Sequence, residues 1–317
     1  MWVPPKMGSP SPFDPGLLEF IRQAEAAPLN PNATLAEQRI AYVAASRTLD
    51  LPRAKGLVSE NIELPGPEGV VPARVYRPRA GVLPVVAYFH GGGFVFGNCD
   101  SHDSITADLA AAADAAVISV DYRLAPENPF PGAFDDCLAA VQAIFSRAND
   151  LQFDATRMVV AGDSSGGELA AAIALALRGS EGPTLRGQVL IYPMLGLDFE
   201  SVSCRDHADA PMLKTSAARA LAGLYLPGGF ATADWRAAPL LAEDLGGLPP
   251  TFITVAEHDP LRDQGLAYAA RLAEDDVPVS LSRAPGLVHS WLRARGMSSA
   301  ASFEFRRIVA ELRLMLG

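Results

Sequence analysis

The chain has 317 residues, of which 49% are hydrophobic and 20% are charged, so it can bury a large core, most simply in one α/β domain with added segments. Its 36 acidic residues outnumber its 26 basic residues, and the formal net charge is -10. Because a nucleic-acid site needs clustered Lys and Arg, and the sequence has no such run, this balance argues against nucleic acid as a partner.

The N-terminus lacks the apolar stretch and the small-residue cleavage site of a secretory signal. No apolar run reaches the roughly 18 uncharged residues that a membrane-spanning helix needs. The cysteines are odd in number, lie far apart and form no C-x-x-C pair, which argues against a disulfide framework and against a zinc site; they are Cys99, Cys137 and Cys204. We therefore expect a cytoplasmic protein without stable membrane insertion.

Two helices are predicted before any strand. Apolar residues recur at helical spacing over residues 13–27, and a second helix begins at Thr34, where Glu37 three positions later completes a capping-box pattern. The turn-rich residues 28–32 separate the helices. This pair forms either a lid, mobile or fixed, or a plain packing extension.

A sheet with helices on both faces is predicted for the rest of the chain. Alternating apolar residues over 57–64 and 71–75 are typical of an antiparallel hairpin. Later strands are apolar on both faces, as in a parallel sheet, at 84–89, 116–120, 158–161, 189–191 and 252–255. Helical patterns alternate with them at 103–113, 133–148, 166–178, 262–274 and 299–315, and a last short strand is predicted at 279–282. This rhythm predicts an α/β fold with a doubly wound sheet.

About fifty residues separate Tyr192 from the strand at 252–255, so this part of the chain contains an insertion. Residues 214–226 have helical spacing and are followed by Pro-Gly-Gly. We predict a helix there, outside the sheet.

A nucleophilic serine is predicted where the strand at 158–161 turns sharply into a helix. Such a turn strains the serine and admits only small residues two positions before and after it. Gly162 and Gly166 flank Ser164 in this way. Ser165 competes, but Asp163 would then occupy a flanking position and obstruct the turn.

A serine nucleophile needs a histidine base held by a carboxylate, and in α/β-hydrolase folds the chain order is Ser, acid, His. Three histidines follow Ser164. His207 lies in the insertion, and His258 ends a strand with no suitable acid before it. His289 follows the last strand in a loop and is the predicted base.

The acid is expected at the carboxyl end of the strand at 252–255. Glu257 still belongs to the strand end, and Asp263 lies one turn into the next helix, where first-turn acids usually complement the helix dipole. Asp259, in the loop before Pro260, is favoured over both.

A glycine run follows the strand at 84–89, where lipases and esterases place the backbone amides of their oxyanion hole. Its sequence is His90-Gly91-Gly92-Gly93-Phe94. A further donor is the amide of Ser165 at the start of the following helix. We interpret His90 as a scaffold that hydrogen-bonds the loop.

Together with the segments 121–127, 162–167 and 259–263, this run resembles the bacterial hormone-sensitive-lipase-like carboxylesterases with a G-D-S-x-G motif. The resemblance spans residues 57–315. It implies an eight-stranded α/β-hydrolase sheet, cap helices in residues 1–50, a catalytic domain at 51–317 with a cap insertion at about 195–235, and no cofactor. It also implies hydrolysis of small-molecule esters with short to medium acyl chains.

The resemblance assigns Ser164 as nucleophile, Asp259 as acid and His289 as base. It assigns the oxyanion donors to the amides of Gly92, Gly93 and Ser165. Related esterases often pair through a sheet edge, so a homodimer is a further expectation.

Several positions depart from the family pattern. Ser165 replaces a common alanine and keeps its amide, Gln264 replaces glutamate, and Glu168 replaces asparagine. Glu168 either orders the turn or faces solvent. Trp291 either narrows the pocket or belongs to the core.

We assign substrate binding to four residues that each have a competing role in the core: Phe94, Met212, Tyr225 and Trp291. Asp100, His102 and Asp103 are compatible with a metal site, but with Ser101 they are better interpreted as capping the next helix. We expect no metal. The resemblance implies that Arg123 pairs with an acid beneath the pocket.

The leading hypothesis is a serine carboxylic-ester hydrolase that works through an acyl-enzyme. A small-molecule deacetylase or an acyltransferase would use the same residues with a different acceptor or substrate. A non-catalytic ligand receptor on this fold is a third hypothesis, but such receptors lack a working histidine, and His289 is in place here.

Overall fold

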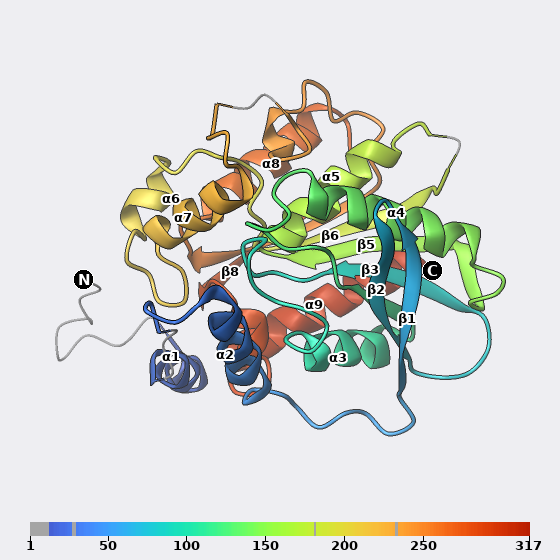
Figure 1. Cartoon of the computed structure of the whole chain (residues 1–317), viewed down its shortest axis with the longest axis horizontal. Coiled ribbons are helices and arrows are strands. Elements are labelled where there is room, and N and C mark those ends of the chain that lie inside the picture. Colours follow the sequence, from blue (N-terminus) through green and yellow to red (C-terminus); the bar gives the residue numbers. More distant parts are fainter. Residues whose placement is uncertain (1–12, 27–29, 181, 232–233) are drawn as a thin grey trace.

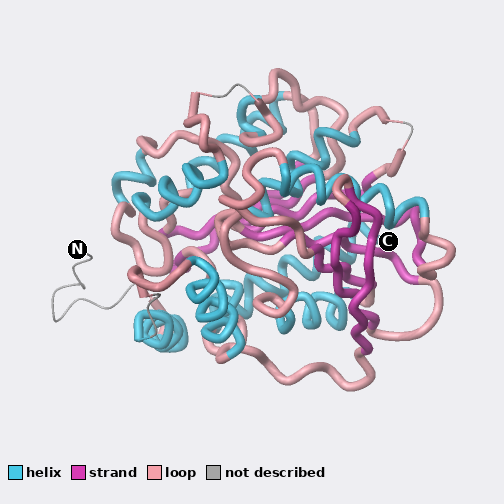
Figure 2. The backbone as a smooth tube through the Cα atoms, in the orientation of Figure 1, coloured by secondary structure: helices cyan, strands magenta, loops and turns pink. Residues whose placement is uncertain are grey.

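The computed structural model describes residues 13–26, 30–180, 182–231 and 234–317. A single sheet forms the central layer, with helices on both of its faces (Figures 1 and 2). The strands are β1 (Val58–Gly66), β2 (Gly69–Arg77), β3 (Leu83–Phe89), β4 (Ala116–Val120), β5 (Phe153–Asp163), β6 (Leu185–Ile191), β7 (Thr251–His258) and β8 (Val279–Val288). Their order in the sheet is β1-β2-β4-β3-β5-β6-β7-β8.

β2 pairs antiparallel with both of its neighbours, whereas every pairing from β4 to β8 is parallel. The eight-stranded, mostly parallel sheet confirms the predicted fold class. The middle strands are apolar on both faces because helices cover both faces; all seven residues of β3 are buried.

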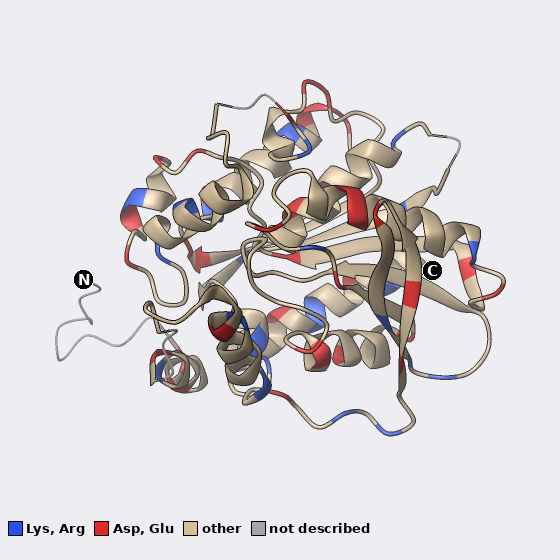
Figure 3. Cartoon of the chain, viewed as in Figure 1, with Lys and Arg blue, Asp and Glu red and all other residues tan. Residues whose placement is uncertain are grey.

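On one face of the sheet lie α3 (Asp103–Ala113) and α9 (Ser299–Leu316), and on the other lie α4 (Gly132–Ser146), α5 (Ser165–Leu177) and α8 (Arg262–Glu274) (Figure 1). Each face has its own apolar cluster. Charged positions lie mainly on the surrounding helices and loops, with both signs interspersed (Figure 3).

Four further helices lie outside these two layers: α1 (Pro15–Ala26), α2 (Leu35–Arg47), α6 (Val202–Asp206) and α7 (Thr215–Tyr225). The predicted capping box is present, since the Glu37 amide donates to Thr34 Oγ1 and the Thr34 amide donates to Glu37 Oε2. α7 corresponds to the helix predicted at 214–226. The five-residue helix α6 was not predicted.

Two predictions about local structure were wrong. β8 extends to Val288 rather than ending near residue 282, because an irregularity in the pairing between Ala256 and His258 lets the strand continue past Pro285 and Gly286. The second concerns the start of α3, where the N-cap residue His102 makes no capping bond.

The acids at the start of α3 instead pair with arginines of other segments. Asp103 accepts bonds from Arg53 and Arg74, and Asp100 lies 2.8 Å from Arg74. No group of metal-ligating side chains is present in the part of the chain that the structure describes, and none of its described helices is long and apolar enough to cross a membrane.

Candidate active site

The turn between β5 and α5 holds Ser164 in a conformation that few side chains adopt, with φ 57° and ψ −120°. The two flanking glycines are sterically required. A Cβ on Gly162 would lie 2.2 Å from the Gly166 carbonyl oxygen, and one on Gly166 would lie 2.0 Å from the Phe89 oxygen. Strand and helix therefore approach closely, and Ser164 is raised above the carboxyl end of the sheet.

The structure brings together the serine, the histidine and the aspartate that the sequence favours. His289 Nε2 lies 2.9 Å from Ser164 Oγ, and His289 Nδ1 lies 2.7 Å from Asp259 Oδ2. Asp259 is fully buried, and its other oxygen accepts the Leu261 amide at 2.8 Å. With the proton on Nδ1, the imidazole donates to Asp259 and offers its Nε2 lone pair to the serine hydroxyl.

The competing acids bond to other groups. Glu257 accepts the Gly286 amide at 2.8 Å, and Asp263 accepts the Ser203 amide at 2.7 Å. Neither carboxylate has a bond to His289 among the described residues.

The competing histidines lie together, apart from Ser164. The rings of His207 and His258 pack edge to face with centroids 5.5 Å apart, and Arg262 donates to His207. Burial and the positive charge of Arg262 lower the pKa of His207.

The glycine loop, residues 90–94, adopts backbone angles that favour glycine, with φ 132° at Gly92 and 63° at Gly93. No backbone hydrogen bond to the amide of either glycine is present among the described residues. The amide of Ser165 belongs to the first turn of α5, whose N–H groups have no partner within the helix. These amides can therefore donate to an oxyanion.

His90 supports the glycine loop, as the sequence predicts. Its Nδ1 lies 3.0 Å from the Gly91 oxygen, and its ring stacks on Tyr122, whose hydroxyl donates to the His90 carbonyl. Burial lowers the pKa of His90 to about 3, so the ring is neutral at pH 7.

The four residues assigned to substrate binding lie in three places. Phe94 and Tyr225 stack with ring centroids 3.8 Å apart, where the end of α7 meets the glycine loop. Met212 lines a cavity of about 270 Å³ bounded by α1, α2 and Ser290. Trp291 is fully buried and packs against Tyr192, which fits the core role that the sequence left open.

Glu168 does not face solvent. It is fully buried on α5, and both of its carboxyl oxygens lack a hydrogen-bond partner among the described residues. Burial raises the pKa of Glu168 well above its ordinary value, and the nearby charge of Asp234 adds to the shift. The hydroxyl of Tyr225 is likewise buried without a partner in the described chain.

Two other polar residues noted in the sequence hold segments around the site. Gln264 Oε1 accepts the amides of Leu195 and Gly196 at 2.9 and 3.0 Å, which ties the start of the insertion to α8. Arg123 pairs with the buried Asp136, as expected.

Sequence reasoning missed the polar cluster directly beneath Ser164. Asp163 was considered only as an obstacle to Ser165, yet its carboxylate accepts bonds from the Tyr88 hydroxyl and the Gly91 amide. The available signal was the position of Asp163 between Gly162 and Ser164, because an acidic side chain in a buried turn requires hydrogen-bonding partners.

Comparison with known proteins identifies the family of this chain. A family model described as the alpha/beta hydrolase fold matches residues 86–293. Esterase LipI of Mycobacterium tuberculosis is 40% identical over 280 residues, which is 85% of this chain and 87% of that protein. Carboxylesterase NlhH of the same organism is 41% identical over 251 residues, covering 78% and 79%.

Solved structures superimpose on more than nine tenths of this chain. A thermostable esterase from Pseudomonas putida superimposes with a TM-score of 0.90 at 30% identity, covering 98% of this chain and 99% of that one. The carboxylesterase EstE1, cloned from a metagenomic library, gives a TM-score of 0.87 at 36% identity, covering 91% and 100%.

Proposed function

Because this chain belongs to the hormone-sensitive-lipase-like branch of the α/β-hydrolase family and hydrolyses carboxylic esters, we propose that Ser164, His289 and Asp259 form its catalytic triad. The observation that carries the proposal is the pair of short contacts made by His289, 2.9 Å to Ser164 Oγ and 2.7 Å to Asp259 Oδ2. In this arrangement one nitrogen of the base faces the nucleophile and the other faces the carboxylate.

In the acylation step, His289 takes the Ser164 proton while the hydroxyl oxygen attacks the ester carbonyl. The imidazolium, stabilised by Asp259, then donates its proton to the departing alcohol, which leaves an acyl-enzyme. In the deacylation step, water takes the place of the serine hydroxyl. His289 accepts a proton from the water molecule, and the resulting hydroxide attacks the acyl carbon. His289 then returns the proton to the departing Ser164 oxygen.

The amides of Gly92, Gly93 and Ser165 stabilise the oxyanion in both halves of the reaction. Loss of one such donor typically costs roughly 3 kcal/mol of transition-state stabilisation. The positive φ angles of the two glycines support this assignment. Glycine adopts such angles without steric strain because it has no side chain, and this lets the loop turn sharply.

The substrates we propose are small-molecule esters with short to medium acyl chains. A cap formed by residues 1–50 and the insertion at about 195–235 covers the pocket of the catalytic domain at 51–317; residues 1–12, 27–29 and 232–233 of this cap lie outside the described residues. Leu221 of α7 supports this division, since a Cβ on Gly93 would lie 2.7 Å from its side chain. We further propose that the enzyme works in the cytoplasm, which is consistent with three free, buried cysteines.

Pairing of two chains through β8 is a further proposal. β8 is the last strand of the sheet, and Leu281 on it is 40% exposed. Light scattering on the purified protein tests it: a dimer is expected, and a monomer over the whole concentration range would rule it out.

The triad is tested by Ser164→Ala on a nitrophenyl ester series of increasing acyl length. We expect kcat to fall by about 10³-fold or more. Near wild-type turnover would refute the role of Ser164. Among Glu257→Gln, Asp259→Asn and Asp263→Asn, the largest loss must occur at Asp259.

A fluorophosphonate probe tests whether the serine is activated. Labelling of the wild type but not of Ser164→Ala is expected for a hydrolase, whereas an unlabelled wild type would favour a ligand receptor. Added alcohols test for transfer: an ester product formed faster than the free acid would favour an acyltransferase.

A further inference from the structure

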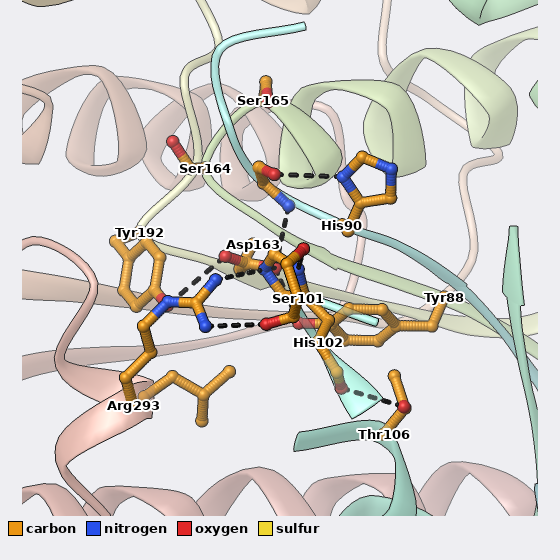
Figure 4. Close-up of polar contacts among 12 residues, drawn as sticks. Tyr88, His90, Ser101, His102, Thr106, Asp163, Ser164, Ser165, Tyr192 and Arg293 are labelled. Atoms are coloured by element: carbon orange, nitrogen blue, oxygen red, sulfur yellow. Dashed lines mark hydrogen bonds and ion pairs between the residues drawn. The ribbon is translucent and has the colours of Figure 1, made fainter. Parts of the chain in front are cut away.

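A buried polar cluster lies directly beneath Ser164 and joins segments that are far apart in the sequence (Figure 4). Asp163 ends β5, His102 precedes α3, and Arg293 belongs to the short helix η2 (Trp291–Ala294) that follows His289. The side chains of Asp163 and His102 are almost completely buried, and Arg293 is half-buried. A buried cluster of this kind must satisfy its charges internally.

The Asp163 carboxylate reaches the glycine loop. It accepts the Tyr88 hydroxyl at 2.7 Å and the Gly91 amide at 3.1 Å. The contact is tight, since a Cβ on Gly91 would lie 2.6 Å from Asp163 Oδ2. The carboxylate therefore fixes the His90–Gly91 peptide, one residue before Gly92.

Hydrogen bonding assigns the tautomer of His102. Ser101 Oγ accepts the Asn98 amide and donates to the Asn98 carbonyl, so its 2.9 Å contact with His102 Nδ1 requires a proton on that nitrogen. His102 Nε2 lies 3.2 Å from Arg293 Nη2, which can only donate. The imidazole is therefore neutral, in accord with a pKa lowered by burial.

Arg293 supplies the positive charge that balances Asp163. Its Nη1 donates to the Ser101 carbonyl at 2.7 Å, and its Nη2 donates to His102, whose Nε2 lies 3.4 Å from Asp163 Oδ1. The guanidinium and the carboxylate thus meet at the same nitrogen of one neutral ring. Arg293 also contacts Tyr42 of α2, with 3.3 Å between Nη2 and the hydroxyl.

We propose that Asp163 and Arg293 are positioning residues for ester hydrolysis. Asp163 holds the oxyanion amides in place through Gly91, and Arg293 balances the negative charge of Asp163 at the ring of His102. The proposal rests on the proposed role of the glycine loop. It predicts an effect on turnover rather than on substrate binding, because the oxyanion forms only after attack.

The test is a double-mutant cycle with Asp163→Asn and Arg293→Met, read as kcat and KM on one nitrophenyl ester. Each single variant should lower kcat about tenfold or more with KM within about twofold, a partial loss of oxyanion stabilisation. In the Asp163→Asn background, Arg293→Met should cost less than about threefold, because no charge remains to be compensated.

Arg295 provides the control, since this buried arginine lies two residues further on but pairs with Asp108 of α3. Arg295→Met should lower the melting temperature, leave kcat unchanged, and show no coupling with Asp163→Asn. If Arg293→Met does not fold, Arg293→Gln repeats the cycle with a neutral side chain that keeps a donor.

Additive losses in kcat, unchanged kcat in both single variants, or a change confined to KM would overturn the proposal. Its failure is distinguishable from failure of the triad. An inactive Ser164→Ala together with fully active Asp163→Asn and Arg293→Met refutes only the positioning role, whereas an active Ser164→Ala refutes the proposed function itself.

Discussion

Replacing Glu168 by Gln should stabilise the protein by an amount that grows with pH. The carboxyl is fully buried and has no hydrogen-bond partner in the described chain, and burial raises its pKa well above the ordinary value of 4.5. The unfolded chain releases this proton near pH 4.5, whereas the folded chain keeps it. The wild type therefore has its full stability below pH 4.5 and loses stability as the pH rises toward the folded pKa.

The size of the effect follows from linkage. Each pH unit between the two pKa values costs the wild type about 1.4 kcal/mol, and Gln, which does not titrate, avoids this cost. An unfolding entropy of about 2.1 cal/mol/K per residue over 317 residues gives about 0.7 kcal/mol/K. The melting temperature of Glu168→Gln relative to the wild type should therefore rise by about 2 °C for each pH unit above about 5.

Thermal unfolding in matched buffers from pH 4.5 to 7.5 measures this slope. Glu304→Gln is the control, because Glu304 is equally buried but accepts a bond from Thr254 and lies 3.7 Å from Arg307. That variant should be less stable than the wild type. A difference for Glu168→Gln that stays flat across the pH range would show that the folded protein ionises Glu168 freely, and the reasoning would be wrong.

Three further substitutions test the loop and the insertion. Gly93→Ala should lower kcat about tenfold or more, because the new methyl meets Leu221 and the φ of 63° disfavours a side chain; an unchanged kcat would contradict the loop's role. Ser165→Ala should keep kcat within about threefold, since the 3.3 Å bond from the Phe94 amide to the hydroxyl is weak and the backbone donor remains; a loss comparable to that of Ser164→Ala would contradict this. Gln264→Leu leaves two buried amides without their acceptor and should lower stability by about 2 kcal/mol or more in urea unfolding, and an unaffected midpoint would refute that cost.

The sequence was sufficient to predict those parts of the site that depend on residues close together in the chain. The turn at Ser164 requires small residues at positions 162 and 166, and both glycines meet backbone atoms there. Asp259 was favoured over Glu257 by its place in the loop after the strand, and the contact with His289 agrees with that choice.

Contacts between residues far apart in the chain could not be predicted from the sequence. Every residue of α5 except Ala176 is buried, so its helical periodicity does not indicate where Glu168 points. The bond from Tyr88 to Asp163 spans 75 positions, and that from Arg293 to His102 spans 191. The capping assigned to Asp103 was wrong for the same reason, since its arginine partners come from residues 53 and 74.

The stacking of Tyr225 on Phe94 has a consequence for how this enzyme can evolve. Tyr225 ends α7, its carbonyl accepts the Phe130 amide at 2.9 Å, and its ring lies against the residue that closes the glycine loop. A mutation that moves the end of α7 would also move the support of that loop. Substitutions in α7 and in the glycine loop are therefore expected to evolve together.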